Sequence, residues 1–211
     1  MTIIIDYGIG NVFSVQRSLE HCGDQNVKLS SDPDQIYNAD KIILPGVGAF
    51  RDGIQGLTDK NLIEPILDGI KRGKPILGIC LGMQMLASSS TEFGNYDGLD
   101  VIPGKVIPII DNKEYNDNLI KIPHIGWSSL NIKNELPPKS ILNKLDNKSY
   151  AYLVHSFHVK TSNESHTTAT YNYANLEVTA AIQKDNVIGL QFHPEKSGQF
   201  GLNIIKKFIS L

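Results

Sequence analysis

A cysteine lies between two glycines in the segment Gly78-Ile79-Cys80-Leu81-Gly82, directly after the apolar run Pro75-Ile76-Leu77. A strand that turns into a helix through a G-x-C-x-G bend presents its central side chain, as in the G-x-S-x-G nucleophile elbow. Glycines lack a Cβ, so the turn closes without a clash. Unpaired N–H groups and the dipole of the following helix would favour a thiolate at Cys80. On its own the motif also fits a structural cysteine in a βα loop.

A base for this thiol is available in the segment Gln191-Phe192-His193-Pro194-Glu195, more than a hundred residues later. The proline biases His193 towards an extended conformation, in which side chains two residues apart project to the same face. Glu195 would then hold one tautomer of the His193 ring and leave the other nitrogen for Cys80. Alone, such a segment also fits a loop histidine beside a surface acid. Together the two segments predict a Cys80–His193–Glu195 triad.

The loop Pro45-Gly46-Val47-Gly48 follows another apolar run and provides a third element. An inward-turned N–H of Val47 or Gly48, with the N–H of Leu81, would form an oxyanion hole. The loop also fits an ordinary tight βα turn, and it does not resemble a P-loop because no Gly-Lys-Ser/Thr follows. These residues together indicate acyl transfer through a thioester, with an amide or an ester as the substrate.

The length, net charge and cysteine content of the chain restrict the partners and cofactors that we expect. The chain has 211 residues and a formal net charge of -2, so we expect a single domain over residues 1–211 that binds neither nucleic acid nor membrane. Its two cysteines, Cys22 and Cys80, form no C-x-x-C pair, so we expect no metal and no cofactor. We see no signal peptide, and the most apolar window is too short to span a membrane. A cytoplasmic setting follows.

Strand and helix patterns alternate over the first ninety residues and predict a parallel sheet flanked by helices. The active site of such a sheet lies beyond the carboxyl ends of its strands, where the elbow and the Pro45–Gly48 loop would meet. The expected strands are Thr2–Asp6, Asn26–Leu29, Lys41–Leu44 and Pro75–Ile79, and the helical segments are Asn11–Cys22, Asn61–Lys71 and Met83–Ala87.

Between about residues 101 and 192, short β-rich segments separated by turn residues predict an added antiparallel portion. We expect a surface loop at Asn131–Lys148 and a closing helix from Gly198 to Leu211. The fold class is therefore α/β, with a mostly parallel central sheet, a nucleophile elbow and an antiparallel β portion in the second half. The expected strands here are Lys105–Ile110, Leu119–Ile122, Ala151–His155, Thr167–Tyr173, Glu177–Gln183 and Val187–Phe192.

The two segments that carry the triad resemble the class I (triad) glutamine amidotransferase family over essentially the whole chain. Within it, three further segments resemble the branch of glutaminase subunits of imidazole glycerol phosphate synthase. These are Pro45–Phe50, Pro123-His124-Ile125-Gly126-Trp127 and Val154-His155-Ser156-Phe157. The resemblance implies glutamine as the substrate and ammonia as the product that a partner consumes.

By position, the resemblance implies that glutamine is held by Gln84, Glu92 and backbone groups of Gly48, Ser156 and Phe157. It implies a (β/α)₈ cyclase subunit as the partner in a heterodimer of histidine biosynthesis. Contacts to that partner would come from Asn11, Trp127, Tyr152 and Lys196. Each also has a plainer interpretation, as a helix, core or surface residue.

Three other functions stay open. Relatives with the same chemistry supply ammonia to a sugar amidotransferase in surface-polysaccharide synthesis. A non-catalytic regulatory subunit would keep the fold without turnover, although all three triad residues are present. A free-standing cysteine amidase or peptidase would act without a partner and would leave Pro123–Trp127 unexplained.

Overall fold

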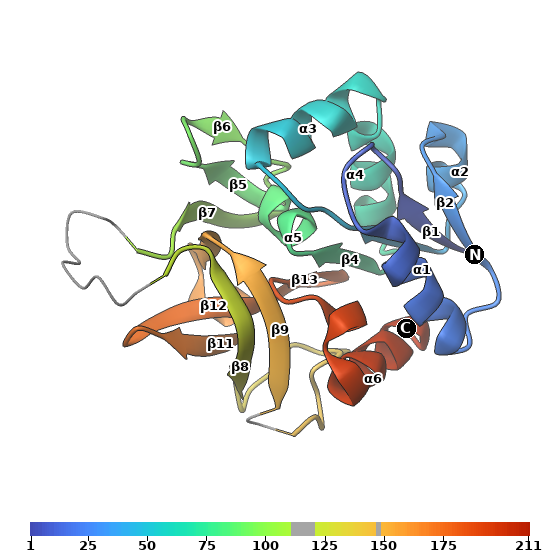
Figure 1. Ribbon diagram of the computed structural model, residues 1–211. Coiled ribbons are helices and arrows are strands. Elements are labelled where there is room, and N and C mark those ends of the chain that lie inside the picture. Colours follow the sequence, from blue (N-terminus) through green and yellow to red (C-terminus); the bar gives the residue numbers. More distant parts are fainter. Residues whose placement is uncertain (111–120, 147–148) are drawn as a thin grey trace.

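The computed structural model describes residues 1–110, 121–146 and 149–211 (Figure 1). The helices are α1 (Val12–His21), α2 (Pro33–Tyr37), α3 (Phe50–Asp59), α4 (Ile63–Lys71), α5 (Leu81–Met85) and α6 (Gly198–Ile209), with 3₁₀ turns η1 (Glu164–His166) and η2 (Pro194–Lys196). The strands are β1 (Thr2–Ile5), β2 (Val27–Ser30), β3 (Lys41–Leu44), β4 (Ile76–Ile79), β5 (Ala87–Ser90), β6 (Tyr96–Asp97), β7 (Ile102–Pro108), β8 (His124–Ile132), β9 (Tyr150–His155), β10 (Phe157–Thr161), β11 (Thr167–Tyr173), β12 (Leu176–Lys184) and β13 (Val187–Leu190).

Within the described residues, nine strands form one sheet in the order β2-β1-β3-β4-β13-β12-β11-β8-β9. The strands from β2 to β13 run parallel to one another, and those from β12 to β9 continue the sheet with antiparallel pairing. A second sheet has the order β10-β7-β5-β6. This arrangement confirms the predicted α/β class with its antiparallel portion.

The parallel half of the large sheet is buried on both faces, which explains its uninterrupted apolar strands. Along β1, Ile4 faces a core that includes Leu19 of α1 and Phe208 of α6. Its neighbours Ile3 and Ile5 face the opposite core, where α2, α3 and α4 pack together with the second sheet (Figure 1). Successive isoleucines of β1 therefore pack alternately against the elements that cover the two faces of the sheet.

Most predicted elements match the structure to within one or two residues, but the place of β13 differs from the prediction. We expected Val187–Phe192 in the antiparallel portion. Instead β13 pairs in parallel with β4, with Val187 opposite Ile76 and Leu190 opposite Ile79, and its other edge pairs antiparallel with β12. All four residues of β13 are buried, as a central strand requires.

Several boundaries also need correction. The helix after Cys80 ends at Met85, and Ala87 begins β5. The strand predicted at Lys105–Ile110 begins earlier, at Ile102. The predicted surface loop Asn131–Lys148 starts inside β8 and buries Ile141 and Leu142 in the core. Of the strand predicted at Leu119–Ile122, the first two residues lie outside the described residues and the last two are not in a strand.

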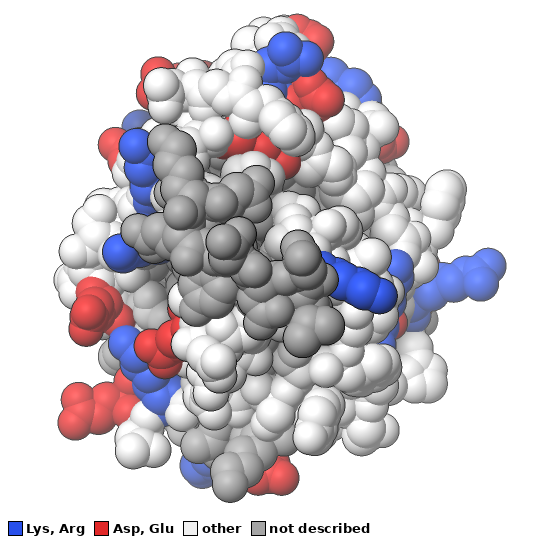
Figure 2. Space-filling model, turned by 60° about the vertical axis from the view of Figure 1, so that its left-hand side comes forward, with Lys and Arg blue, Asp and Glu red and all other residues white. Residues whose placement is uncertain are grey.

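None of the helices in the described ranges is long and apolar enough to cross a membrane. On the face shown in Figure 2, the described acidic and basic side chains are interspersed, and neither sign forms a continuous surface.

Candidate active site

Three loops meet at the carboxyl edge of the parallel strands. Because β3, β4 and β13 are adjacent and parallel, the residues that follow them lie side by side. These residues are the Pro45–Gly48 loop after β3, Cys80 after β4, and His193 after β13. The topology thus brings together residues that are remote in the sequence.

Cys80 occupies a strained turn that only its glycine neighbours allow. Its backbone has φ 54° and ψ -109°, and its N–H donates to the carbonyl of Leu190, at the end of β13, at 2.7 Å. A Cβ on Gly82 would overlap the carbonyl of Leu44, and one on Gly78 would lie 2.8 Å from the backbone of Gly82. The helix that follows Cys80 has only five residues, so its dipole contributes little to the stability of a thiolate. Cys80 itself is buried, with 6% of its surface exposed.

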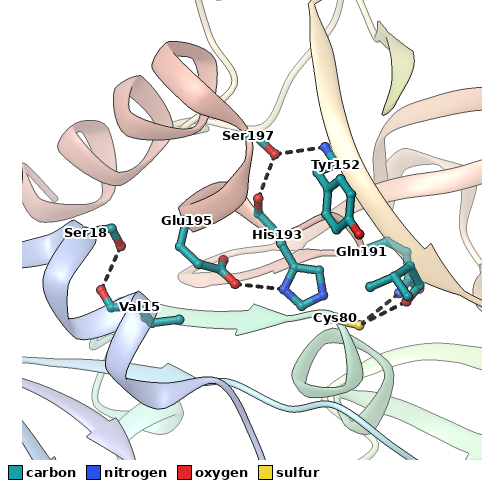
Figure 3. A network of polar contacts seen from close by, with 9 residues as sticks. Val15, Ser18, Cys80, Tyr152, Gln191, His193, Glu195 and Ser197 are labelled. Carbon is teal, nitrogen blue, oxygen red and sulfur yellow. Dashed lines mark hydrogen bonds and ion pairs between the residues drawn. The ribbon is translucent and has the colours of Figure 1, made fainter. Parts of the chain in front are cut away.

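His193 and Glu195 form a buried pair beside the sulfur (Figure 3). The Nδ1 of His193 donates to Oε1 of Glu195 at 2.9 Å, with side chains 3% and 1% exposed. The opposite nitrogen, Nε2, faces Cys80 and has no hydrogen-bond partner among the described residues. Burial lowers the pKa of His193, but the neighbouring Cys80 and Glu195 outweigh that effect and raise the pKa to about 9. The ring is oriented by its carboxylate and is ready to exchange a proton at Nε2.

Glu195 reaches His193 by a route that differs from the expected one. His193 is extended, as the following proline predicts, but Pro194–Lys196 forms a 3₁₀ turn that folds the carboxylate back onto the ring. Strand β9 holds this turn: the N–H of His193 donates to the carbonyl of Tyr152 at 3.0 Å. The Ser197 hydroxyl donates to the carbonyl of His193 at 2.6 Å and accepts from the N–H of Tyr152 at 3.0 Å (Figure 3).

The loop after β3 turns a carbonyl towards the elbow. The N–H of Leu81 donates to the carbonyl of Gly46 at 3.3 Å, so the chain itself occupies this predicted oxyanion donor. Gly48 has φ 103°, and the side chain of Val47 is exposed. Tyr7 supports the loop by donating its hydroxyl to the carbonyl of Pro45 at 2.6 Å. Burial, and then the nearby Cys80, raise the pKa of Tyr7, which keeps its hydroxyl protonated.

Glu92 lies beside the same loop. Its Oε2 accepts from the N–H of Phe50 at 2.6 Å, at the first residue of α3, where Ala49 offers no side-chain acceptor. Burial raises the pKa of the Glu92 carboxyl, and the hydrogen bond from Phe50 acts in the opposite direction. Glu92 therefore caps α3 and ties the second sheet to the loop that contains Gly48.

A chain of buried polar groups connects Cys80 with the second sheet. Nε2 of Gln84 donates to the carbonyl of Phe157 at 2.9 Å and to Oε1 of Gln191 at 3.1 Å. The same Phe157 carbonyl accepts from Nδ1 of His155 at 2.8 Å, and Nε2 of His155 accepts from the Tyr171 hydroxyl at 2.8 Å.

Burial lowers the pKa of His155 to about 3, so this ring is neutral and acts as a support for the chain at Phe157. The neighbouring Ser156 carbonyl accepts from the N–H of Ile109 at 2.9 Å, which pins the turn between β9 and β10 to β7. Two of the predicted substrate residues, Gln84 and Phe157, are thus in direct contact.

Tyr152 contacts two of the other three predicted interface residues, Trp127 and Lys196. Trp127 on β8 is 53% exposed and lies opposite Tyr152 on β9, with the ring centroids 6.0 Å apart. Lys196 places its Nζ 5.7 Å from the centroid of the Tyr152 ring. Asn11 stands apart in sequence at the start of α1, where its side chain does not cap the helix.

In the described ranges, no three His, Cys, Asp or Glu side chains gather in a way that would hold a metal ion. Two site features had no specific signal in the sequence, namely the support of the loop by Tyr7 and the contact of Gln191 with the sulfur. Gln191 lies within the motif that contains His193, so its proximity to the triad was visible but its contact was not.

Comparisons with known proteins agree with this geometry. The sequence matches the family description "Glutamine amidotransferase class-I" over residues 3–211. The imidazole glycerol phosphate synthase subunit HisH 1 of Legionella pneumophila (strain Paris) is 46% identical over 210 residues, which cover 99% of this chain and 98% of that protein. The corresponding HisH subunit of Geobacter sulfurreducens is 45% identical over 205 residues, covering 97% of this chain and 96% of that protein.

A solved structure of PurLQS from Thermotoga maritima superposes with a TM-score of 0.71 at 19% identity, and covers 99% of this chain and 97% of that chain. It shares the fold. The family match and the two sequence relatives show more than the fold, because they span nearly the full length of the chain. The chain belongs to the class-I glutamine amidotransferases.

Proposed function

We propose that this chain, as a single domain over residues 1–211, is the glutaminase subunit of an imidazole glycerol phosphate synthase. It would hydrolyse glutamine to glutamate and ammonia and pass the ammonia to a cyclase subunit in histidine biosynthesis. The observation that carries the proposal is the meeting of Cys80, His193 and Glu195 at one sheet edge. The relatives named HisH, at 43–46% identity, support the pathway.

In the first half of the reaction, the thiol proton of Cys80 passes to Nε2 of His193, and the sulfur attacks the side-chain amide carbon of glutamine. Glu195 stabilises the imidazolium that results. The tetrahedral intermediate then collapses: the carbon–nitrogen bond breaks, and the proton on Nε2 goes to the departing ammonia. A glutamyl thioester on Cys80 remains.

In the second half, Nε2 of His193 takes a proton from a water molecule, which attacks the thioester. The carbon–sulfur bond breaks, the proton returns to the sulfur of Cys80, and glutamate leaves. The amide nitrogen of Gln84 donates both of its hydrogens within the protein, to the carbonyl of Phe157 and to Oε1 of Gln191. Its amide oxygen is the group that would accept a hydrogen bond from the substrate. With Glu92 and the backbone of Gly48, Ser156 and Phe157, it would hold the amino-acid end of glutamine.

Stabilising the oxyanion requires a rearrangement of the loop after β3. The carbonyl of Gly46 points at the N–H of Leu81, which must be free to donate to the oxyanion. Rotating the Gly46–Val47 peptide would remove this carbonyl and turn the N–H of Val47 inwards in the same step. We propose that binding of the cyclase favours the rotated state, so that glutamine is hydrolysed when ammonia has a consumer.

The partner would be a (β/α)₈ cyclase that binds the outer face of β8 and β9. Ile125, Trp127 and Tyr150 are exposed on this face, beside Tyr152. Trp127 is exposed and packs on the half-buried Tyr152, which Lys196 borders, and such an aromatic side chain is typical of an interface anchor. Tyr152 is also hydrogen-bonded to the His193 segment, so the surface and the base share one strand. Free thiols at Cys22 and Cys80 support a reducing, cytoplasmic setting.

The test is co-purification with candidate synthase chains, followed by an assay of glutamine-dependent product formation. We expect a complex with the cyclase that makes imidazole glycerol phosphate from glutamine. In a matched control, the complex with Cys80→Ala should use ammonium salts but not glutamine.

Other outcomes of this test identify the rivals. Binding to a sugar amidotransferase, with ammonia delivered there, would identify the polysaccharide-linked relative instead. Turnover of other amides without any partner would point to a free-standing amidase. A complex without glutamine turnover would point to a regulatory subunit.

A further inference from the structure

The fully buried amide of Gln191 contacts the nucleophile. Its Nε2 lies 3.8 Å from the sulfur of Cys80, within hydrogen-bond range for a sulfur acceptor (Figure 3). The triad mechanism assigns no role to this side chain. A second group near the sulfur, the carbonyl of Val154, lies 3.9 Å away and accepts hydrogen bonds only. The sulfur therefore faces one donor amide and one acceptor carbonyl.

The orientation of the Gln191 amide follows from its neighbours. The carbonyl of Phe157 only accepts, so the Gln84 amide must turn its nitrogen towards it. The same nitrogen donates its second hydrogen to Oε1 of Gln191. With its oxygen engaged there, Gln191 has its nitrogen towards Cys80. A flipped Gln191 would place two donors, the nitrogens of Gln84 and Gln191, against each other.

The backbone holds Gln191 in register with the elbow. The N–H of Gln191 donates to the carbonyl of Ala180 at 2.8 Å, which anchors it to β12. The preceding carbonyl, of Leu190, accepts from the N–H of Cys80 at 2.7 Å. The contact between the amide and the sulfur thus spans two adjacent chain segments that are themselves hydrogen-bonded.

We propose that Gln191 donates a hydrogen bond that stabilises and orients the thiolate of Cys80, with Gln84 as the positioning residue that fixes the Gln191 amide. The inference rests on the proposed function, because it concerns the nucleophile of that reaction. The Val154 carbonyl accepts from the S–H of the thiol form, and the Gln191 amide donates to the thiolate form. When the proton leaves the sulfur for Nε2 of His193, the hydrogen bond from the S–H to the Val154 carbonyl is lost. The hydrogen bond from the Gln191 amide to the thiolate compensates for part of that loss.

The test measures alkylation of Cys80 by iodoacetamide as a function of pH, without glutamine or partner. Mass spectrometry of the Cys80-containing peptide separates it from Cys22. The variant Gln191→Met keeps a similar volume and removes the amide. Gln191→Asn keeps an amide that is one methylene too short to contact both Gln84 and the sulfur. Gln183→Met is the matched control, since Gln183 is equally buried but donates to the carbonyls of Pro138 and Asp185.

Hydrogen bonds to charged groups are strong enough to move the midpoint of the rate profile upwards by about 1 pH unit in Gln191→Met, with alkylation near neutral pH about tenfold slower. We expect a shift in the same direction for Gln191→Asn and none for Gln183→Met. A wild-type midpoint in folded Gln191→Met, or an equal shift in Gln183→Met, would overturn the inference. If Gln191→Met does not fold, a wild-type midpoint in Gln191→Asn would overturn the inference in the same way.

The readout needs no glutamine turnover, so it is independent of the proposed function. If the wild-type protein makes no product with the cyclase but the Gln191 variants show the expected alkylation shifts, only the proposed function is refuted. If the wild type is a working synthase subunit but the Gln191 variants keep the wild-type pH profile of Cys80 alkylation, only the inference about Gln191 is refuted.

Discussion

Replacing Glu195 by glutamine should change how the stability of the protein depends on pH. The pKa of His193 is raised from its ordinary value of 6.5 to about 9, against the effect of burial, by Cys80 and by Glu195. A group whose pKa is raised on folding stabilises the protein below its unfolded pKa. That contribution is lost as the pH rises through the folded pKa. Between pH 6.5 and 9 the wild type should therefore become less stable.

The size of the effect follows from the burial of the pair. Each pH unit of difference is worth about 1.4 kcal/mol, and only the part of the rise that comes from Glu195 changes stability, because a proton that moves from Cys80 to His193 leaves the proton count of that pair unchanged. The free energy of unfolding should therefore fall by on the order of 1–2 kcal/mol across this window. The two side chains are 3% and 1% exposed, so solvent and salt screen the interaction little. In Glu195→Gln the neutral amide no longer stabilises the imidazolium, and we expect most of the fall to disappear.

The assay is urea unfolding, followed by circular dichroism, at intervals from pH 6 to pH 10. His193→Gln removes the titrating ring and should flatten the fall, whereas His21→Gln, at an exposed histidine, should leave it unchanged. The reasoning is refuted if Glu195→Gln retains the full wild-type fall, or if wild-type stability increases between pH 6.5 and 9.

Three further outcomes follow from packing and exposure. Cys80→Ala should reduce glutamine hydrolysis by on the order of 10³-fold or more while the affinity for the cyclase, measured by titration calorimetry, is retained. Gly82→Ala should cost more than about 4 kcal/mol in urea unfolding because its Cβ overlaps a backbone carbonyl, whereas Gly23→Ala, with open space around it, should cost only about 1–2 kcal/mol of backbone strain. Trp127→Ala should weaken cyclase binding about 30-fold with little change in unfolding, because the side chain is exposed. Leu211→Ala, at an exposed residue near Pro75 and Asn186 at the amino ends of β4 and β13, should change neither. Equal affinity of the Trp127 variant would exclude that side chain from the interface.

The parallel half of the fold and the triad were predictable because their signals are local. Apolar runs ending in Pro45-Gly46 and in Gly78 mark strands that turn at one edge, and the glycine spacing around Cys80 has a steric cause. Helix α3 was not predicted because Gly53 and Gly56 lower its helix propensity. The structure needs those glycines: a Cβ on Gly53 would lie 2.7 Å from the sulfur of Met85.

The remaining differences arise from contacts between distant segments. The buried run of β13 fits a central parallel strand as well as an antiparallel one, and only its pairing with β4 decides between them. The role of Tyr7 depends on a hydrogen bond to Pro45, and that of Gln191 on the amide of Gln84. Neither contact leaves a periodic pattern in the sequence, so sequence analysis places these residues near the site without assigning their partners.

The insertion of β13 between β4 and β12 has a consequence for biosynthesis of the enzyme. Until Val187–Leu190 and His193 leave the ribosome, the chain carries its thiol without the base of the triad, and one edge of β4 has no hydrogen-bonding partner. The last strand to be translated closes the sheet and delivers the base in the same event. A chain that ends before His193 therefore lacks both the base of the triad and the central strand of the sheet, and should not hydrolyse glutamine.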